Sequence, residues 1–387
     1  MMGSFKNAGS KLWDVSSSIP IHTTNVMKRS RSLNHNEWEQ VGQTITGEGR
    51  LDLSGEAVAL SEDGSILAIG AVDNDGNSTS ADNNQGHVRV YTYESISALW
   101  TQLGTDIDGV FAQDKFGHAL ALSGNGLILA VGAPSHDNPQ DDIGRVRVYE
   151  FQLSQNDWVQ IGDDILGTNL GDRNGFSVTL DYDGNNLAVG APDSDANGED
   201  SGYVRTFYYD RGGTDNWEQV GNDILGEATA DRSGYAVSFS RSGERLAVGA
   251  IFNDGINGVN SGHVRVHEWN STSGDWDKIG NDIDGGFHDD QSGFSVSLNG
   301  PGDVVAIGSP QNNEGTGLLE IYEFDGTEWQ ARTSGGPIIG SGEIQTVKDY
   351  LKFLSVCSLI NILTPPIVTI HSFIRLHRQL WSFCLHF

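Results

Sequence analysis

The sequence has few basic residues and, over most of its length, no cysteine. It carries 23 Lys and Arg against 52 Asp and Glu among 387 residues, a formal net charge of -29. Such a surface repels DNA, RNA and anionic membranes, so we predict no nucleic-acid partner. Both cysteines, Cys357 and Cys384, lie near the C-terminus. The acidic part of the chain is therefore expected to fold without disulfide bonds.

Familiar catalytic signatures are also missing. The sequence contains no HExxH, GxSxG, P-loop or CxxC motif, and its 11 histidines do not cluster at metal-ligand spacing. The N-terminal segment has no apolar core of the length that a secretory signal needs. Residues 1–36 are rich in Ser and Asn, and we expect them to form a disordered lead-in. The sequence predicts no catalytic residue.

What the sequence does have is glycine, 50 residues of it, and an internal repeat of about 60 residues. One unit contains the segments DRNGFSVTLD at 172, LAVGAP at 187, GYVRTF at 202 and WEQVGNDILG at 217. Each segment is short, rich in branched and aromatic residues, and bounded by Gly, Asp, Asn or Ser, which is typical of strands. The repeat is marked by tryptophan, at Trp38, Trp100, Trp158, Trp217, Trp276 and Trp329.

This pattern predicts an all-β fold, a β-propeller of four-stranded antiparallel blades over residues 37–340. Five complete repeats are visible, and five to seven blades are possible, although a seven-bladed ring needs residues that this chain lacks. We interpret Trp329 as the degraded start of a sixth copy. The leading strand at 38–47 is expected to close the ring by pairing with the last blade.

The repeat resembles the FG-GAP repeat of the integrin α-subunit propeller. The letters of that name correspond to Phe116-Gly117 and Gly132-Ala133-Pro134, and Gly190-Ala191-Pro192 is a second match. The resemblance covers residues 38–330 and implies a β-propeller used for binding and adhesion, usually outside the cell. In calcium-binding FG-GAP repeats an Asp-rich loop joins the first two strands. Here that connection is short, so the calcium site of the family is largely absent.

Acidic loops instead follow the Gly-Ala-Pro segment, where they would form a variable rim. The loop DSDANGED at 193–200 places oxygen ligands at alternate positions before Gly198, as the opening of a calcium loop does. A solvated polar loop is the alternative interpretation. Calcium is the only cofactor we consider, and its candidate ligands are Asp193, Asp195, Asn197, Asp200, Asp73 and Asp75.

An arginine recurs on the third strand of four repeats. It could form a ring that binds a ligand, but we expect it to pair with a repeated acidic residue of the same or the next blade. The arginines are Arg89, Arg147, Arg205 and Arg265. The candidate partners are Asp52, Asp114, Asp172, Asp231 and Asp290.

The tail, residues 341–387, is apolar and could be helical. Residues 353–370 lack charge over the length of a marginal membrane span, although Pro365-Pro366 interrupts them. Because the repeat stops abruptly, the tail could instead be non-natural coding sequence, for example an intron read through by a gene model. The sequence does not decide between a membrane anchor, such an artefact and a packed segment.

These features favour a non-enzymatic binding or adhesion module whose rim loops contact a protein or glycan at the cell exterior. Two alternatives stay open. One is a propeller enzyme, a hydrolase or lyase with a site in the central channel. The other is a calcium-stabilised structural protein. Membrane contact is expected only through the tail.

Overall fold

The computed structural model describes residues 23–29, 38–75, 84–137, 142–332 and 338–339, which form one two-stranded and five larger antiparallel sheets. The first strands of the five larger sheets are β3 (Ser54–Leu60), β8 (Ala119–Leu122), β13 (Ser177–Leu180), β18 (Ser233–Phe239) and β23 (Ser295–Leu298). The second strands are β4 (Ile66–Ala71), β9 (Ile128–Ala133), β14 (Asn186–Ala191), β19 (Arg245–Ala250) and β24 (Val304–Ser309).

The third strands are β5 (His87–Glu94), β10 (Arg145–Gln152), β15 (Tyr203–Tyr209), β20 (His263–Asn270) and β25 (Leu318–Phe324). The fourth is split into two parts, both paired with the third: β6 (Leu99–Gln102) and β7 (Ile107–Asp108), β11 (Asp157–Gln160) and β12 (Ile165–Leu166), β16 (Trp217–Gln219) and β17 (Ile224–Leu225), β21 (Asp275–Lys278) and β22 (Ile283–Asp284), β26 (Trp329–Ala331) and β27 (Ile338–Ile339).

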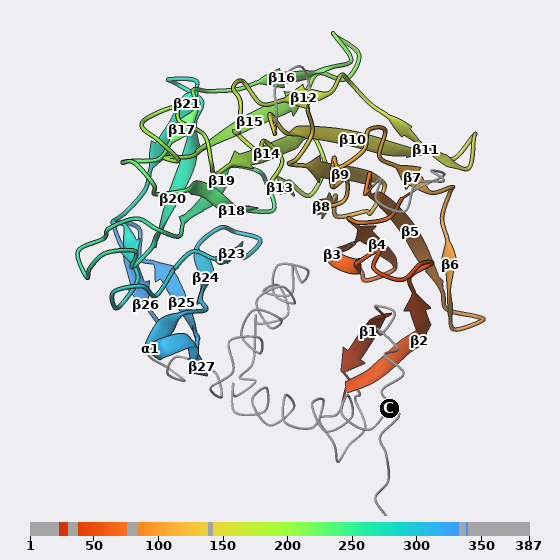
Figure 1. Ribbon diagram of the computed structural model, residues 1–387, viewed down its shortest axis with the longest axis horizontal. Coiled ribbons are helices and arrows are strands. Elements are labelled where there is room, and N and C mark those ends of the chain that lie inside the picture. Colours follow the sequence, from red (N-terminus) through yellow and green to blue (C-terminus); the bar gives the residue numbers. More distant parts are fainter. Residues whose placement is uncertain (1–22, 30–37, 76–83, 138–141, 333–337, 340–387) are drawn as a thin grey trace, which may run out of the picture.

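The sheets are the blades of a β-propeller. Figure 1 shows them following one another around a central axis, with the first strand of each blade innermost. The predicted all-β class and the four-stranded antiparallel blade are confirmed. In the described part of the chain the only helix is the single turn α1 (Asn312–Gly315).

Paired glycines let the blades approach closely. A Cβ atom on Gly132 of the second blade would lie only 2.0 Å from the carbonyl oxygen of Gly175 in the third. Gly175 itself has a φ of +88°, which disfavours any side chain there. The same contact joins Gly190 to Gly234. The two glycines of the repeat are therefore explained by blade-to-blade packing, which is the structural role of Gly190-Ala191-Pro192.

The repeated tryptophans connect the outer strands of neighbouring blades. The indole N–H of Trp217 donates to the carbonyl of Ile161 in the preceding blade at 3.2 Å, and Trp158 bonds to Leu103 in the same way at 2.8 Å. Gly162 has a φ of +69°, and a Cβ there would lie 2.7 Å from Cδ1 of Trp217. The Trp and the Gly of the WxQxG segment thus belong to one contact between blades.

Two predictions about the ends of the repeat are wrong. Trp329 does not begin a sixth unit, because its strand β26 pairs with β25 and completes the fifth blade. The leading strand β2 (Trp38–Thr46) does not pair with the last blade either, but with β1 (Thr23–Arg29). The Trp segment ends a blade rather than starting one. A repeating sequence alone does not show which of its segments comes first in each structural unit.

The β1–β2 hairpin packs against the first blade as a preceding outer strand would. The indole of Trp100 donates to the carbonyl of Val41 at 2.8 Å, and the side-chain amide of Gln43 bonds to the backbone N–H and carbonyl of Trp100. The described residues therefore contain five complete blades and part of the outer layer of another.

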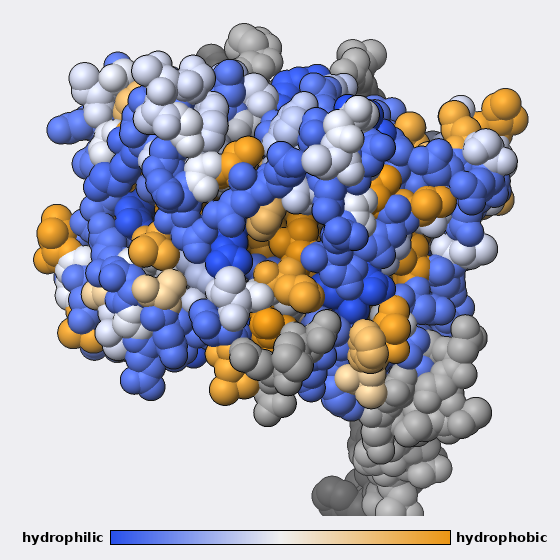
Figure 2. All heavy atoms as spheres, turned by 90° about the horizontal axis from the view of Figure 1, so that it is seen from above, coloured by the Kyte–Doolittle hydropathy of each residue, from blue (hydrophilic) through white to orange (hydrophobic). Residues whose placement is uncertain are grey.

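The surface of the propeller is mostly polar. In Figure 2 hydrophilic residues cover most of the face in view, with apolar side chains in scattered groups. No helix in the described ranges is long and apolar enough to cross a bilayer. The prediction of a disordered lead-in over residues 1–36 is wrong for residues 23–29, which form strand β1 by pairing with β2. The remaining residues of that lead-in and the tail at 341–387 lie outside the described residues.

Candidate functional site

One end of the central channel is formed by the turns that join the first and second strands of each blade, and we call it the hairpin end. Backbone hydrogen bonds of 2.7–3.0 Å link these turns from blade to blade. At each link the N–H of one turn donates to the carbonyl of the same position in the next blade, through Glu62, Gly124, Tyr182, Arg241 and Gly300. The position is thereby fixed by the backbone, whatever its side chain.

A cavity of about 80 Å³ lies at the hairpin end and is lined by residues from all five blades. Its apolar wall consists of Leu60, Leu122, Leu180, Phe239 and Leu298. Three functional side chains meet above this wall. Arg241 forms an ion pair with Glu62, and its guanidinium carbon lies 3.7 Å from the ring centre of Tyr182. The ion pair spans blades one and four, and both side chains are partly exposed.

Asp181 adds a buried carboxyl group to the same cavity. Burial raises the pKa of Asp181, although hydrogen bonds from Asn186 and the backbone of Asn185 oppose that shift. These bonds, at 2.7–3.0 Å, hold the carboxylate in its own turn. Asp181 therefore shapes the cavity, while Glu62 and Arg241 are the groups that a small molecule in the channel could reach.

Aromatic rings stand at the opposite end of the inner strands, which we call the aromatic end. Neighbouring ring centres are 4.9–5.1 Å apart along a row of repeat-equivalent residues. The row consists of His118, Phe176, Tyr235 and Phe294. The guanidinium of Arg173 lies 5.0 Å from the ring centre of Phe176. This end offers flat apolar faces with cations above them, an arrangement that suits binding better than proton transfer.

The rim loops lie at the aromatic end, and four predicted calcium ligands make contacts of another kind there. Asp193 pairs with Arg173 at 3.0 Å and Arg232 at 3.2 Å. Asp195 accepts the backbone N–H of Asp200. Asn197 donates to the carbonyl of Gly226 at 2.8 Å.

The other two predicted ligands are also engaged. Asp73 pairs with Lys115, and Asp75 accepts the backbone N–H of Asn84 at 3.0 Å. In the described ranges, none of the six predicted residues belongs to a group of three acidic or histidine side chains close enough to share an ion. Calcium at these loops stays a prediction.

The five candidate aspartates are not the partners of the four arginines, and that assignment is wrong, although Arg147 and Arg205 do pair with another repeated aspartate of their own blade. Asp114 instead pairs with Arg145 and His136. Two other members of the set fasten loops. Asp172, only 1% exposed, accepts the backbone N–H groups of Thr168 and Asn169 at 2.8 and 2.9 Å, and the hydroxyl of Tyr203. Asp231 likewise accepts from the backbone of Glu227 and Ala228. Two backbone N–H groups beside each of these carboxylates explain why an aspartate recurs at this place.

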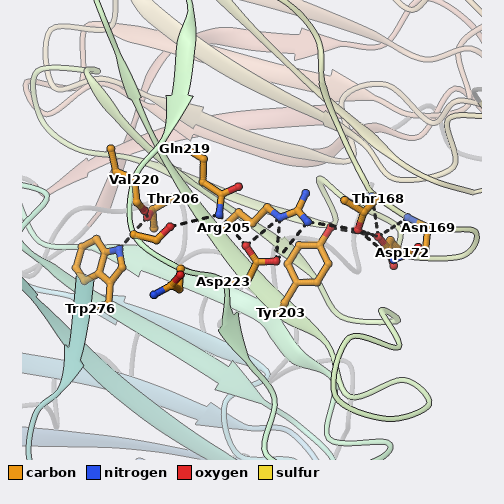
Figure 3. Close-up of polar contacts among 12 residues, drawn as sticks. Thr168, Asn169, Asp172, Tyr203, Arg205, Thr206, Gln219, Val220, Asp223 and Trp276 are labelled. Carbon is orange, nitrogen blue, oxygen red and sulfur yellow. Dashed lines mark hydrogen bonds and ion pairs between the residues drawn. The ribbon is translucent and has the colours of Figure 1, made fainter. Parts of the chain in front are cut away.

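The arginine column lies where each blade meets the chain before it, and it pairs there with other carboxylates, which come from the same blade or from that preceding chain. We call these contacts seams. The first seam lies between the β1–β2 hairpin and blade one, and the second, third and fourth lie before blades two, three and four. In the third seam, shown in Figure 3, Arg205 contacts Asp223 at 3.2 Å and the hydroxyl of Thr168 at 3.3 Å. In the second, Arg147 bonds to Asp164 at 2.7 and 2.9 Å.

The first and fourth seams differ from these two. Arg89 pairs with Glu48 at 3.3 Å, and Arg265 with Glu227 at 3.5 Å. A histidine joins the acidic residues in each. Over the described ranges, two groups of acidic and histidine side chains could therefore hold a metal ion: Glu48, His87 and Asp106, and Glu227, His263 and Asp282.

Sequence reasoning missed both the pair at the hairpin end and the histidine groups. Glu62 and Arg241 are 179 residues apart. The available signal was the turn itself, because aligned copies place Glu62, Gly124, Tyr182, Arg241 and Gly300 at one position, where the residue type changes from each repeat to the next and only glycine occurs twice. The repeat likewise aligns His87 with His263, and Glu48 with Glu227.

Comparison with solved structures finds other propellers. A periplasmic gluconolactonase of Pseudomonas aeruginosa, PpgL, is 14% identical, with a TM-score of 0.50 over 83% of this chain and 84% of that one. A Bacteroides uniformis protein provisionally described as a 6-phosphogluconolactonase is 12% identical, with a TM-score of 0.46 over 81% and 95% of the two chains. The β-propeller domain of Cps50 (Swd1) from Myceliophteria thermophila is 11% identical, with a TM-score of 0.42 over 76% and 74%.

No family model matches the sequence, and no curated protein matches it. At this level of identity the structural likeness shows the fold, a β-propeller. The prediction of a non-enzymatic adhesion module, and of a chain that is not an enzyme, is corrected by the same comparison, because a structure described as a gluconolactonase is among the similar ones. The propeller enzyme that the sequence left as an alternative therefore becomes the proposal.

Proposed function

We propose that this protein is a propeller hydrolase whose site is the hairpin end of the channel, and that its substrate is a lactone. The observation that carries the proposal is the meeting of Glu62, Tyr182 and Arg241 over a cavity to which all five blades contribute. Lactone hydrolysis is the activity named for the Pseudomonas propeller. The repeat fixes the backbone here and leaves the side chains to supply chemistry.

In the proposed reaction Glu62 acts as the general base. It takes a proton from a water molecule, whose oxygen attacks the lactone carbonyl carbon. The ring C–O bond then breaks, and the leaving oxygen receives the proton back from Glu62. Lactone and water become one hydroxy acid. Arg241 stabilises the negative charge that develops on the carbonyl oxygen, and it can also hold an acidic group of the substrate.

The resting ion pair sets a requirement on the substrate. Arg241 occupies the Glu62 carboxylate in the resting ion pair, and a cavity of about 80 Å³ holds only a few water molecules. A substrate carrying a carboxylate or phosphate would draw Arg241 away from Glu62, which opens the cavity and frees the base together. We therefore expect anionic lactones to be preferred over neutral ones.

The test is hydrolysis of gluconolactone and 6-phosphogluconolactone, measured against the uncatalysed rate. We expect Glu62→Gln to lower kcat at least a hundredfold, because general-base catalysis is typically worth that much. Arg241→Met should chiefly raise KM for the phosphorylated substrate. Glu218→Gln, on the exposed part of outer strand β16, is the matched control. Absence of turnover on both lactones, or full activity of Glu62→Gln, would refute the proposal.

Finer features of the sequence interpretation stay proposals as well. We propose that the repeats are of FG-GAP type, supported by the paired glycines at the blade contacts. Calcium at the rim loop around Asp193, a protein or glycan ligand, and a location outside the cell are further predictions. A melting temperature that is the same in chelator and in millimolar calcium would remove calcium from this set.

A further inference from the structure

The four seams form an internal comparison that singles out two of them. Their strands run in the same register, and each contains the repeated arginine and an aspartate on the fourth strand. In the second and third seams these two residues bond directly, so the aspartate is neutralised. In the first and fourth the arginine contacts a glutamate instead, and the aspartate stands beside a histidine.

The histidines of these two seams are buried, and His263 has a ring nitrogen without a hydrogen-bond partner in the described ranges. His87 and His263 are each 2% exposed. Nε2 of His263 has no hydrogen-bond partner in the described part of the chain, and its Nδ1 is 3.9 Å from Oε2 of Glu227, beyond hydrogen-bond distance. Nδ1 of His87 is likewise 3.9 Å from Oδ1 of Asp108. An imidazole buried without partners costs free energy unless something binds it.

The charges around each histidine leave negative charge in excess. The first seam gathers Glu48, Asp106 and Asp108 around Arg89. The fourth seam gathers Glu227, Asp282 and Asp284 in the same way. A cation placed among these groups would relieve the repulsion.

We propose that the first and fourth seams each bind a divalent transition-metal ion of the zinc class, through Glu48, His87 and Asp106 and through Glu227, His263 and Asp282. One imidazole and two carboxylates favour zinc or cobalt over calcium, which takes six or more oxygens. The potential ligand atoms lie within 4.8 Å of one another. Bonds of about 2.0–2.1 Å in a tetrahedral site need ligand atoms about 3.3 Å apart. Rotation of the exposed Glu and Asp side chains could supply that closure.

One of the neighbouring residues that differ between the two sites ranks them. In the first seam the side-chain amide of Gln102 bonds to Asp106 at 2.6 Å. In the fourth, Lys278 occupies the equivalent position and pairs with Asp282 at 2.7 Å. The lysine charge opposes a bound cation, so the first seam binds the metal more tightly. Lys278→Gln should tighten the fourth seam about tenfold, since one charge at this distance near the surface is worth a few kcal/mol before screening.

The experiment uses the full chain without a histidine tag, stripped with chelator and titrated with Zn²⁺ by calorimetry, and with Co²⁺ by visible absorption. We expect two ions per chain with unequal Kd values. His87→Ala should remove the tighter ion and His263→Ala the weaker one. His288→Ala, a change of an exposed histidine beside Asp289 in a rim loop, is the matched control and should leave both.

Because the two seam histidines are buried, Asp106→Asn and Asp282→Asn provide variants at more exposed positions, and circular dichroism checks the fold of all of them. Loss of one ion with each aspartate variant supports the sites even where a histidine variant fails to fold. Zinc binding that survives both aspartate variants, or that disappears in His288→Ala, places the metal elsewhere and overturns the proposal. Absence of any bound ion overturns it as well.

Discussion

The third and fourth seams share a backbone and differ in how well their buried polar groups are satisfied. In the third, Arg205 bonds to Asp223 and Thr168, and Tyr203 bonds to Asp172 (Figure 3). In the fourth, both ring nitrogens of His267 and Nε of Arg265 are buried with no partner in the described part of the chain. Repeats let one blade serve as the reference for another. The comparison teaches that the polar contacts of the third seam stabilise the fold. The fourth seam instead retains buried polar groups without partners among the described residues, which lower the free energy of unfolding.

The largest expected effect is on the third seam. Asp172→Ala removes a carboxylate that accepts from two backbone N–H groups and the hydroxyls of Thr168 and Tyr203. Buried donors left unpaired should lower the free energy of unfolding by about 3 kcal/mol. Urea denaturation measures this, with Asp183→Ala, an exposed turn residue, as the control. A loss equal to that of the control would show that the loop is held by other contacts.

Acid should affect the fourth seam next. Burial lowers the pKa of His263 to about 4 and of His267 to about 3, both below the ordinary value of 6.5. As the pH falls below 6.5, these two histidines bind protons in the unfolded chain but remain neutral in the folded chain. Stability is therefore full above pH 6.5 and is lost below it, by up to about 1.4 kcal/mol per pH unit for each histidine.

Urea midpoints at pH 7.5, 6.5 and 5.5 test this linkage, with the double variant His263→Gln and His267→Phe as reference. The reference should lose less stability than the wild type between pH 6.5 and 5.5. Equal losses would mean that the two rings protonate without unfolding.

A smaller effect, of opposite sign, is expected from His267→Phe alone. Phe207 is the repeat-equivalent residue of the third blade, so the seam is built to contain an aromatic ring of that size. Removing two unsatisfied nitrogens should raise the free energy of unfolding by about 1 kcal/mol at pH 7. Thermal and urea unfolding measure it. Destabilisation instead would mean that His267 has a partner, such as an ordered water molecule, that it needs.

The smallest effect should come from Arg205→Lys. Lysine keeps the charge opposite Asp223 but loses the planar fork, and the pair is only partly buried. We expect a loss below about 1 kcal/mol in urea unfolding. The same change at Arg265 should cost more, because its guanidinium is buried and bonds to the carbonyl of Leu225. Equal losses of unfolding free energy at the two positions would show that the two arginines contribute alike, and the proposed difference between the third and fourth seams would be wrong.

The blades could be predicted from the repeat because the residue pattern that favours a strand is contained within the strand's own sequence. The run LAVGA at 187–191 reads as a strand buried on both faces, and β14 is one. The point at which each blade begins depends on which strands pair, and the sequence does not show that. For this reason the sequence predicts that Trp329 starts a new blade, whereas it lies at the end of the fifth. Charge partners were predicted wrongly for a related reason. Asp172 and Asp223 are both plausible partners of Arg205 in one dimension, and only the strand register decides between them.

The candidate site was the least predictable part. Its two charged residues lie in different blades and meet only because the five turns converge on one axis. A motif search looks for fixed spacing along the chain, and a site that takes one residue from each repeat has none. The rim loop around Asp193 showed the opposite failure, in which a convincing local pattern is engaged by Arg173 and Arg232 from neighbouring segments.

The backbone hydrogen bonds that link the five turns have an evolutionary consequence. They engage only N–H and carbonyl groups, so the ring of turns is indifferent to the side chains at Glu62, Gly124, Tyr182, Arg241 and Gly300. Substitution at any of these positions changes the chemistry at the mouth of the channel while the scaffold stays intact. A single backbone can therefore present many different channel mouths, and selection can explore them a few residues at a time, because neighbouring positions such as Gly124 and Tyr182 must fit each other.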